Sequence, residues 1–350
     1  MREGLLLYLR CPVSGGKLHL EVTLKEGEEI LDGTLISPEG ARYPIQDGIP
    51  NLVVEADEKV RRTGDQFAFE FLEVGEPEDP EQKRFRDITL FAAKTGFDPR
   101  VYAAPGFDWR LDQDARELGY EPDFSFLEGK LVVDAGCGDG RFAKLAAPLA
   151  REMILLDLGE QIRKAREVTA ELGVVHCVRC NLLHLPLAEG VADFAYSIGV
   201  IHHTPDPPRA LRQISRTVKD GGHLSVWVYP PQYWGNPVKG AITRAIRSRL
   251  LKKELRAQIS FIQRWLMPLG RLQLLVARSR TLKCLLAPLY IVNVPRHDDP
   301  NEMLATVIDY YLPEYIWTYP DVELERMFRE AGVSYRCLPF PTAATGTKGS

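Results

Sequence analysis

The sequence predicts an α/β fold with a mostly parallel sheet, because apolar strands and amphipathic helices alternate along the chain from Lys130 onward. Continuous apolar strands are typical of a parallel sheet that helices cover on both faces. The alternation stops after residue 230 and resumes near residue 322. The expected strands are Leu131–Asp134, Met153–Asp157, Val174–Cys180, Asp193–Ser197, His223–Tyr229, Val333–Leu338 and a short one near Thr345; the expected helices are Arg141–Ala150, Glu160–Leu172, Pro208–Val218 and Val322–Ala331.

Composition is consistent with an ordinary globular protein. The chain has 350 residues, of which 45% are hydrophobic and 26% charged, which suffices for one large domain and a small one. Six scattered cysteines favour a reducing compartment over a disulfide scaffold. We see no secretory signal at the start of the sequence and no apolar stretch of about 18 residues that could span a bilayer. We therefore expect a cytoplasmic protein without a transmembrane segment.

The sequence divides into four expected parts. Residues 1–55 form a small β-rich domain, because alternating segments are separated by glycine turns. Residues 56–124 are an acidic connector with helices that cap the main domain. The main domain comprises residues 125–230 and 306–350. Residues 231–305 are a helical insertion with a strong local excess of basic charge: twelve Lys or Arg and one acid lie between Lys239 and Lys283, in a chain of net charge −4.

One glycine-rich turn carries the strongest chemical signal. The segment from Val132 to Phe142 takes a buried strand through Gly136-Cys137-Gly138-Asp139-Gly140 into a helix. Glycines let a ligand approach the backbone, and the helix N-terminus offers free N–H groups to a carboxylate. Dinucleotide-binding enzymes use a similar turn, but they place a third glycine where Arg141 stands here. The stretch instead closely resembles the class I S-adenosylmethionine-dependent methyltransferases.

The resemblance implies a Rossmann-like sheet with an antiparallel last strand, the cofactor S-adenosyl-L-methionine and the product S-adenosyl-L-homocysteine. It implies that Asp157 accepts hydrogen bonds from the ribose hydroxyls. It also implies that Asn181, where the family usually has Asp, contacts the adenine amino group through its carbonyl oxygen. The implied cofactor-binding residues follow the first four strands: Asp134, Gly136, Cys137, Gly138, Gly140, Asp157, Leu158, Asn181, Leu182, Ile198 and Gly199.

The acceptor side of the site is predicted from two segments. His202 and His203 follow the fourth strand, where the family lines its methyl-transfer site, and they are the candidate catalytic bases; the alternative is that one bonds the loop backbone and the other packs. Tyr310, Tyr311 and Trp317 lie in an aromatic stretch that we interpret either as a wall of the acceptor pocket or as a packed connector. The basic insertion is either a lid over the crevice or a pair of amphipathic helices with solvated faces.

The N-terminal 55 residues resemble a zinc-ribbon-like domain that is often fused to methyltransferases. Zinc-binding members carry paired cysteines, whereas here only Cys11 remains and Ser14 stands where its partner would be. One thiolate cannot build a four-coordinate site, so we expect no metal. Cys177 and Cys180 lie three apart in a predicted strand and therefore point to opposite faces, which predicts core packing rather than a shared metal.

The sequence leaves three functional hypotheses. The first is methyl transfer to a small molecule, such as a natural-product, quinone or lipid-like intermediate, acidic ones included. This hypothesis is compatible with a homo-oligomer. The second is an RNA methyltransferase whose basic insertion tracks phosphates; the acidic chain and the residues after the fourth strand argue against a nucleic-acid partner. The third is a non-catalytic cofactor-binding partner protein, which the intact glycine turn argues against.

Overall fold

The structure is a computed structural model that describes residues 1–74, 80–96, 123–231, 237–338 and 340–349. Parts of the expected connector (75–79 and 97–122) and of the expected insertion (232–236) lie outside these residues.

The described strands form one sheet in the order β1-β2-β3-β4-β7-β6-β5-β8-β9-β11-β10. Its centre is parallel, because β5 pairs with β6 and β8, β6 with β7, and β8 with β9. The last long strand, β11, pairs antiparallel with β9. This confirms the predicted Rossmann-like class. The bounds are β5 Leu131–Ala135, β6 Glu152–Asp157, β7 Val175–Cys180, β8 Ala192–Ile198, β9 Val218–Trp227, β10 Arg336–Cys337 and β11 Ala343–Thr347.

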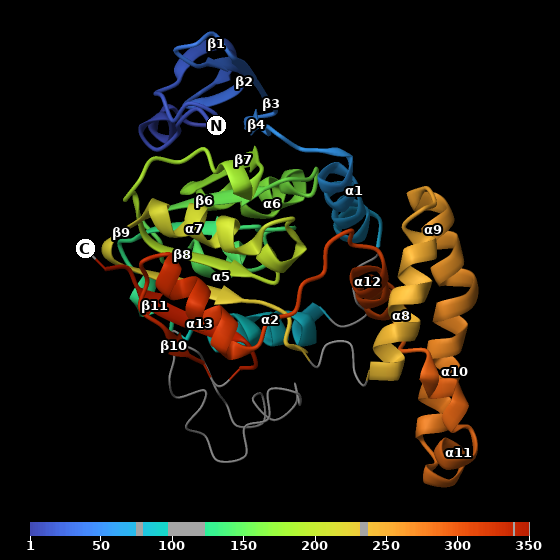
Figure 1. Ribbon diagram of the computed structural model, residues 1–350. Coiled ribbons are helices and arrows are strands. Elements are labelled where there is room, and N and C mark those ends of the chain that lie inside the picture. Colours follow the sequence, from blue (N-terminus) through green and yellow to red (C-terminus); the bar gives the residue numbers. More distant parts are fainter. Residues whose placement is uncertain (75–79, 97–122, 232–236, 339, 350) are drawn as a thin grey trace.

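Helices cover both faces of this sheet, because the buried strands present apolar side chains on each side. Ile162 of α6 shares one core cluster with Leu155, while Leu211 of α7 and Phe328 of α13 share the other with Leu156. Figure 1 shows the helices in layers about the central strands. The bounds are α5 Ala143–Ala146, α6 Ile162–Thr169, α7 Pro207–Thr217 and α13 Asp321–Glu330, with short 3₁₀ turns η2 Ser125–Leu127, η3 Ala170–Leu172, η4 Leu182–His184 and η5 Ile201–His203.

The cysteines of β7 lie on opposite faces of the sheet, as alternation along a strand requires. Cys177 belongs to one core cluster and Cys180 to the other. Burial raises the pKa of the Cys177 thiol to about 12 and that of Cys180 further still. The pair therefore packs in the core and cannot share a ligand.

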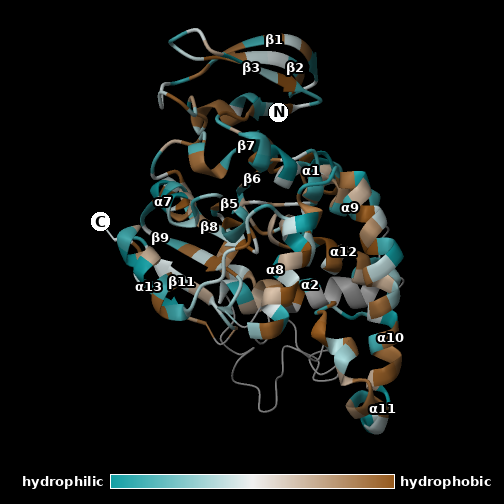
Figure 2. Cartoon of the chain, turned by 45° about the vertical axis from the view of Figure 1, so that its right-hand side comes forward, coloured by the Kyte–Doolittle hydropathy of each residue, from teal (hydrophilic) through white to brown (hydrophobic). Residues whose placement is uncertain are grey.

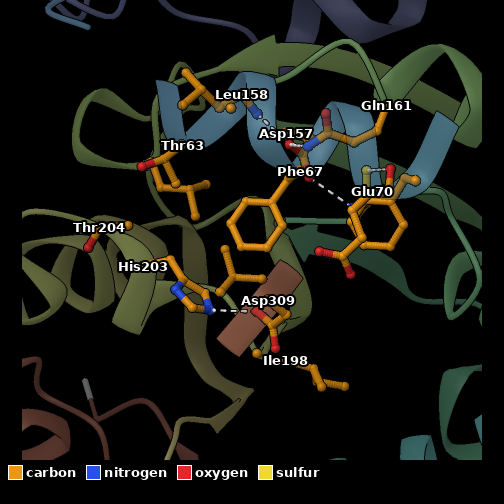
Figure 3. A pocket seen from close by; sticks show the side chains of 18 of the residues that line it. Thr63, Phe67, Glu70, Asp157, Leu158, Gln161, Ile198, His203, Thr204 and Asp309 are labelled. Carbon is orange, nitrogen blue, oxygen red and sulfur yellow. Dashed lines mark hydrogen bonds and ion pairs between the residues drawn. The ribbon is translucent and has the colours of Figure 1, made fainter. Parts of the chain in front are cut away.

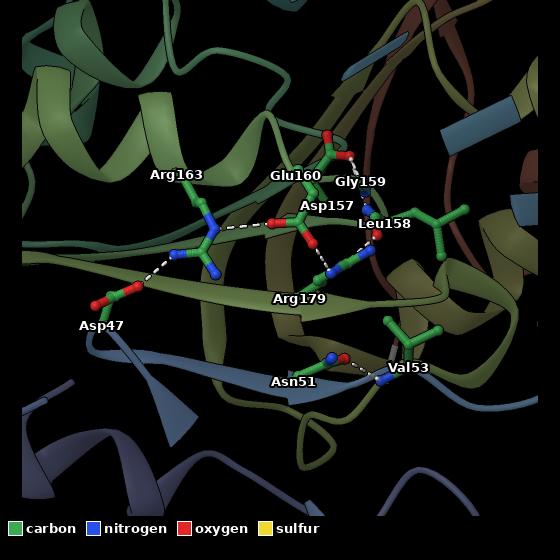
Figure 4. Close-up of polar contacts among 9 residues, drawn as sticks. All are labelled: Asp47, Asn51, Val53, Asp157, Leu158, Gly159, Glu160, Arg163 and Arg179. Carbon is green, nitrogen blue, oxygen red and sulfur yellow. Dashed lines mark hydrogen bonds and ion pairs between the residues drawn. The ribbon is translucent and has the colours of Figure 1, made fainter. Parts of the chain in front are cut away.

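The N-terminal strands extend the sheet. After η1 (Glu3–Leu7), the strands β1 (His19–Glu26), β2 (Glu29–Ile36) and β3 (Arg42–Gln46) pair antiparallel, and β4 (Ile49–Leu52) joins them to the edge of β7 in parallel register. Leu35 and Leu52 belong to the same core cluster as Leu183. Figure 4 shows a polar network over this junction, in which Arg163 bridges Asp47 and Glu160. The β-rich part therefore packs on the main domain and shares its core.

The remaining helices form a third core beside the sheet. Phe69 of α1 (Glu58–Glu73) packs against a cluster that includes Ile262, Met303 and Tyr311. Figure 1 shows α12 between α1 and α8, with α10 and α11 farther from the sheet. In the part of the chain that the structure describes, no helix combines the length and apolar character needed to cross a membrane. The bounds are α2 Pro80–Thr95, α8 Pro237–Leu250, α9 Leu255–Phe261, the π-helical turn η7 Ile262–Leu266, α10 Met267–Ala277, α11 Arg280–Leu285, η8 Ala287–Ile291 and α12 Pro300–Tyr311.

Candidate functional site

A pocket of about 190 Å³ lies at the carboxyl ends of the parallel strands, where open α/β sheets bind their ligands. The strand ends supply one wall and α1 supplies the opposite one, with Asp309 of α12 at the side. Figure 3 shows Phe67 and Glu70 of α1 facing Asp157, Ile198 and His203 across this space. Two segments that are distant in the sequence, α1 and the strand ends from Gly136 onward, therefore enclose the site.

The glycine turn after β5 forms the floor of the pocket. Gly136 has a φ of +94°, and a Cβ there would come within 2.3 Å of Val200, another lining residue. Gly138 has a φ of +56°, and its Cβ would approach the Phe71 ring to 3.1 Å. Glycine is required at Gly136 both for the left-handed backbone and because Val200 packs directly on it, and Gly138 likewise adopts a left-handed φ with the Phe71 ring close by.

Asp157 ends β6 and fixes the shape of the turn. Its carboxylate accepts hydrogen bonds from the backbone N–H of Gly138 at 2.8 Å, of Leu158 at 2.7 Å and of Gly159 at 3.2 Å, and from Gln161 Nε2 at 2.6 Å. Burial raises the pKa of Asp157 to about 6, although the backbone donors oppose this shift. The carboxylate is charged at neutral pH and lies at the pocket wall, so it can also accept from hydroxyl groups of a ligand.

Most of the expected cofactor residues line this pocket: Gly136, Cys137, Gly138, Asp157, Leu158, Asn181, Leu182, Ile198 and Gly199. Two do not. Asp134 is buried within β5, where it accepts from the Tyr196 hydroxyl at 2.7 Å, and burial raises its pKa to about 8. Gly140 faces α6 instead, since a Cβ there would come within 2.9 Å of the Ala165 Cα. Asp134 and Gly140 therefore stabilise the glycine turn from outside the pocket.

Asn181 has a role beyond the one expected. Its Oδ1 accepts from the backbone N–H of Leu183 at 3.0 Å, and its Nδ2 donates to the carbonyl oxygens of Val54 at 3.3 Å and Glu55 at 3.5 Å. The side chain therefore ties the chain leaving β4 to the end of β7. Because it also lines the pocket, it connects the N-terminal strands to the expected adenine end.

The two candidate histidines have different surroundings. His202 does not line the pocket: it is fully buried, its ring centroid lies 3.9 Å from that of Tyr229 in a tilted arrangement, and neither ring nitrogen has a hydrogen-bond partner among the described residues. Burial holds its pKa well below the usual value. The expectation that His202 is a catalytic base is therefore wrong, because the 3₁₀ turn η5 directs its ring toward Tyr229 and Trp227.

His203 lines the pocket and is oriented by two groups. Its Nδ1 lies 2.9 Å from the carbonyl oxygen of Tyr315, which fixes the proton on Nδ1, and its Nε2 lies 3.5 Å from Asp309 Oδ1. Asp309 in turn accepts a hydrogen bond from the Tyr229 hydroxyl. Nε2 makes no hydrogen bond among the described residues, and the Asp309 carboxylate beside it would stabilise the ring once Nε2 takes a proton. Burial lowers the pKa of His203, while Asp309 and the Tyr315 carbonyl partly offset this.

The expected acceptor residues in the aromatic stretch lie elsewhere. Tyr310 and Tyr311 are buried in the third core, and Tyr311 donates to the carbonyl of Asn293. Trp317 is 46% exposed and donates from Nε1 to the Thr204 carbonyl. None of the three lines the pocket, because the helical turn of α12 directs Asp309 toward it instead.

The cover of the pocket is α1, which the sequence argument placed only among capping helices. Its lining residues recur at helical spacing: Val60, Thr63, Gly64, Phe67, Glu70 and Phe71. This stripe is the signal that could have identified the wall. The expected lid, residues 231–305, supplies no lining residue among those described. Its helices pack against α1 and α12 at one side of the site.

The pocket wall is acidic rather than basic. Glu70, Asp139, Asp157 and Asp309 line it, against Arg141. Burial, and then the charge of Asp309, raises the pKa of Glu70 well above its usual range. The basic charge of the insertion therefore does not surround the acceptor space.

The fold and this pocket define a class I S-adenosylmethionine-dependent methyltransferase domain. Residues 133–226 match the family model described as "Methyltransferase domain". The residues of the pocket fit S-adenosylmethionine: the Asp157 carboxylate at the end of β6 can accept from ribose hydroxyls, and Val60, Phe67 and Phe71 of α1 offer apolar surface opposite the glycine turn.

The chain is similar to several known proteins over this domain. It is 34% identical over 95 residues to a probable S-adenosylmethionine-dependent methyltransferase of Mycobacterium tuberculosis, covering 27% of this chain and 34% of that protein. It is 34% identical over 101 residues to a ubiquinone biosynthesis O-methyltransferase of Pectobacterium carotovorum, covering 28% and 42%. The solved YcgJ protein of Bacillus subtilis is 18% identical with a TM-score of 0.35, covering 61% of this chain and 67% of that chain. The chain thus spans about a third of the length of the first of these curated relatives.

Proposed function

We propose that the protein transfers a methyl group from S-adenosylmethionine to a small-molecule acceptor, with His203 as the base. The observation that carries this proposal is the placement of His203, whose ring lines the same pocket as the glycine turn and is held between the Tyr315 carbonyl and Asp309. The cofactor supplies an electrophilic methyl group on a sulfonium. The residues of this chain hold the acceptor in line and receive its proton, and positioning accounts for much of the acceleration of such a displacement.

The surroundings of His203 suit proton uptake. Asp309 is close enough to stabilise the imidazolium that forms, and the Tyr315 carbonyl keeps the ring in one orientation. Asp309 is a positioning residue in this scheme, since it acts through His203. The low pKa of His203 keeps it unprotonated at neutral pH, so that it is ready to act as a base.

The wall of the pocket indicates the class of acceptor. Phe67, Trp227 and Tyr229 present aromatic surface, and the acids nearby disfavour an anionic group beside His203. A neutral, flat or partly apolar molecule with a hydroxyl or amine fits best, which includes natural-product, quinone and lipid-like acceptors. Over its methyltransferase domain the chain is similar to a ubiquinone biosynthesis O-methyltransferase, which supports this class. The acidic wall disfavours an RNA substrate, whose phosphates it would repel.

We also propose that residues 1–55 are a metal-free, zinc-ribbon-like domain used to stabilise the sheet. Cys11 is buried, and its Sγ lies 3.3 Å from the Tyr43 hydroxyl. Ser14, in the place of a second thiol, donates to Glu39 at 2.9 Å. These contacts occupy the positions that metal ligands would take, and β4 uses the edge of β7 as its partner.

The test is a screen of metabolite extract with methyl-labelled S-adenosylmethionine, comparing the natural protein with His203→Gln and Asp309→Asn. We expect a labelled small molecule, and a fall of roughly 10²–10⁴-fold in kcat for His203→Gln, with cofactor affinity retained. His223→Gln, in β9 but outside the pocket lining, is the matched control and should keep full activity. A His203→Gln variant with natural kcat would overturn the assignment of the base. Label found only in RNA would overturn the acceptor class.

A further inference from the structure

The helices beyond the pocket expose a row of apolar side chains. Along η7 and α10, Trp265, Leu272 and Leu275 are 61%, 43% and 59% exposed. They are separated by seven and three residues, which places them on one side of a helix. The opposite side of these helices is covered by protein, because Ile262 and Leu266 are buried in the third core. The outer side has no such cover in the described structure.

The apolar surface continues to the end of this helical arm, which we define as residues 262–291. No residue of α11 or η8 is buried, although both are rich in leucine and isoleucine. Leu285 is 72% exposed, and Leu282, Leu286 and Ile291 are exposed as well. Figure 2 shows hydrophobic segments on α10 and α11, at the end of the arm farthest from the N-terminal strands. A continuous exposed apolar patch of this kind marks an interaction surface.

Arginines follow the apolar row along the same helices. Arg264, Arg271 and Arg278 recur every seven residues, directly beside Trp265 and Leu272 in the sequence. No ion pair joins these three arginines to another residue in the described parts of the chain. Arg280 and Lys283 add charge on α11, and Lys283 lies 6.0 Å from the Tyr290 ring. The patch is therefore both apolar and strongly basic.

We propose that this arm binds the surface of an anionic phospholipid bilayer. An amphipathic helix with apolar and tryptophan side chains beside Lys and Arg lies in the membrane interface, where acyl chains take up the apolar groups and headgroup phosphates pair with the cations. The structure favours this occupant over two others. A second copy would bring two rows of unpaired arginine together at one apolar face. RNA would pair with the cations but leave the leucines exposed, since bases stack on aromatic rings rather than on aliphatic chains.

The arm reaches the active site through packing. Ile262 and Leu266 share their core with Tyr311 of α12, two residues after Asp309. Docking of the arm would therefore hold the pocket near the lipid surface without occupying it. The proposal does not depend on methyl transfer, because the patch contains no lining residue of the pocket.

The test is sedimentation of the full chain with vesicles of phosphatidylcholine, with and without phosphatidylglycerol, over a range of salt. We expect binding to the anionic vesicles that falls as salt rises, and much weaker binding to the neutral ones. Replacing Arg264, Arg271 and Arg278 together with glutamine should lower the partition coefficient on the order of 100-fold. The matched control replaces Arg212, Arg326 and Arg329, which lie on α7 and α13 away from the arm, and should leave binding unchanged.

A second variant separates the apolar contribution from the charge. The double variant Leu275→Ser/Leu285→Ser should bind the anionic vesicles roughly 10-fold or more weakly than the natural protein. This difference should be measured at low salt, where the charge of the arginines still contributes to binding. Both side chains are exposed, so the variant should keep its fold and its affinity for S-adenosylmethionine. Equal binding by the natural protein and the triple glutamine variant would overturn the proposal. So would a dimer that the leucine substitutions dissociate, or RNA binding that displaces the protein from vesicles.

Discussion

Asp157→Ala is the substitution that tests the cofactor pocket most sharply. The carboxylate accepts from three backbone N–H groups and from Gln161, and it is 8% exposed. Removing it deletes the acceptor for the ribose hydroxyls and loosens the loop that shapes the glycine floor. A hydrogen bond to a charged group is worth about 1.5–3 kcal/mol, so loss of one such bond should raise the Kd for S-adenosylmethionine by roughly 10- to 100-fold.

The assay is titration calorimetry with S-adenosylmethionine and S-adenosylhomocysteine, well below the Tm of the variant. Because the pKa of Asp157 is raised to about 6, the natural protein should bind more weakly as pH falls through that value, when the carboxyl gains a proton. The alanine variant should lack this pH dependence. Asp220→Ala, at an exposed position near the start of β9 and outside the pocket lining, is the control and should bind normally. An unchanged Kd in a folded Asp157→Ala protein would refute the placement of the ribose at β6.

Three further predictions concern stability and metal content. Burial raises the pKa of Asp134 in the folded protein to about 8, so the stability that the protonated carboxyl contributes at low pH is lost as pH rises from about 4 toward 8. In thermal scans, Asp134→Asn, which keeps an acceptor for the Tyr196 hydroxyl, should therefore raise Tm more at alkaline than at acidic pH. An equal rise in Tm at both pH values would contradict the burial argument. Gly140→Ala should lower the free energy of unfolding by about 1–3 kcal/mol in denaturant titrations, because its Cβ meets the Ala165 backbone; a neutral effect would show that α6 moves freely. Elemental analysis should find no stoichiometric zinc, since the Cys11 thiol is engaged in a hydrogen bond with the Tyr43 hydroxyl. One zinc per chain would disprove the proposal of a metal-free ribbon.

The sequence was sufficient for the sheet and for the floor of the pocket. Glycine spacing and continuous apolar strands are local patterns, and they located β5 to β9 and the residues at their carboxyl ends. Helix extent was less accurate: the expected helix Arg141–Ala150 is reduced to α5, Ala143–Ala146. The short turn follows from tight packing at Gly140, which a propensity argument does not contain.

The acceptor side could not be derived in the same way because it depends on tertiary contacts. His202 and His203 are adjacent in sequence, and only packing against Tyr229 decides that one is buried and the other faces the pocket. Tyr310 and Tyr311 were expected at the acceptor pocket because they are aromatic, whereas the orientation of α12 brings Asp309 to the pocket instead. The pocket is covered by α1, which is distant in the sequence from the strand ends that it faces. Connectivity alone predicted that residues 231–305 would form the lid, and this prediction was wrong.

The central claim is that the pocket between the glycine turn and α1 binds S-adenosylmethionine. The most direct measurement is calorimetry of the natural full chain with S-adenosylmethionine, S-adenosylhomocysteine and NAD in parallel. We expect one molecule of each of the first two to bind per chain and no heat from NAD, because Arg141 replaces the glycine that a dinucleotide pyrophosphate needs. Binding of NAD without binding of S-adenosylmethionine would contradict the account.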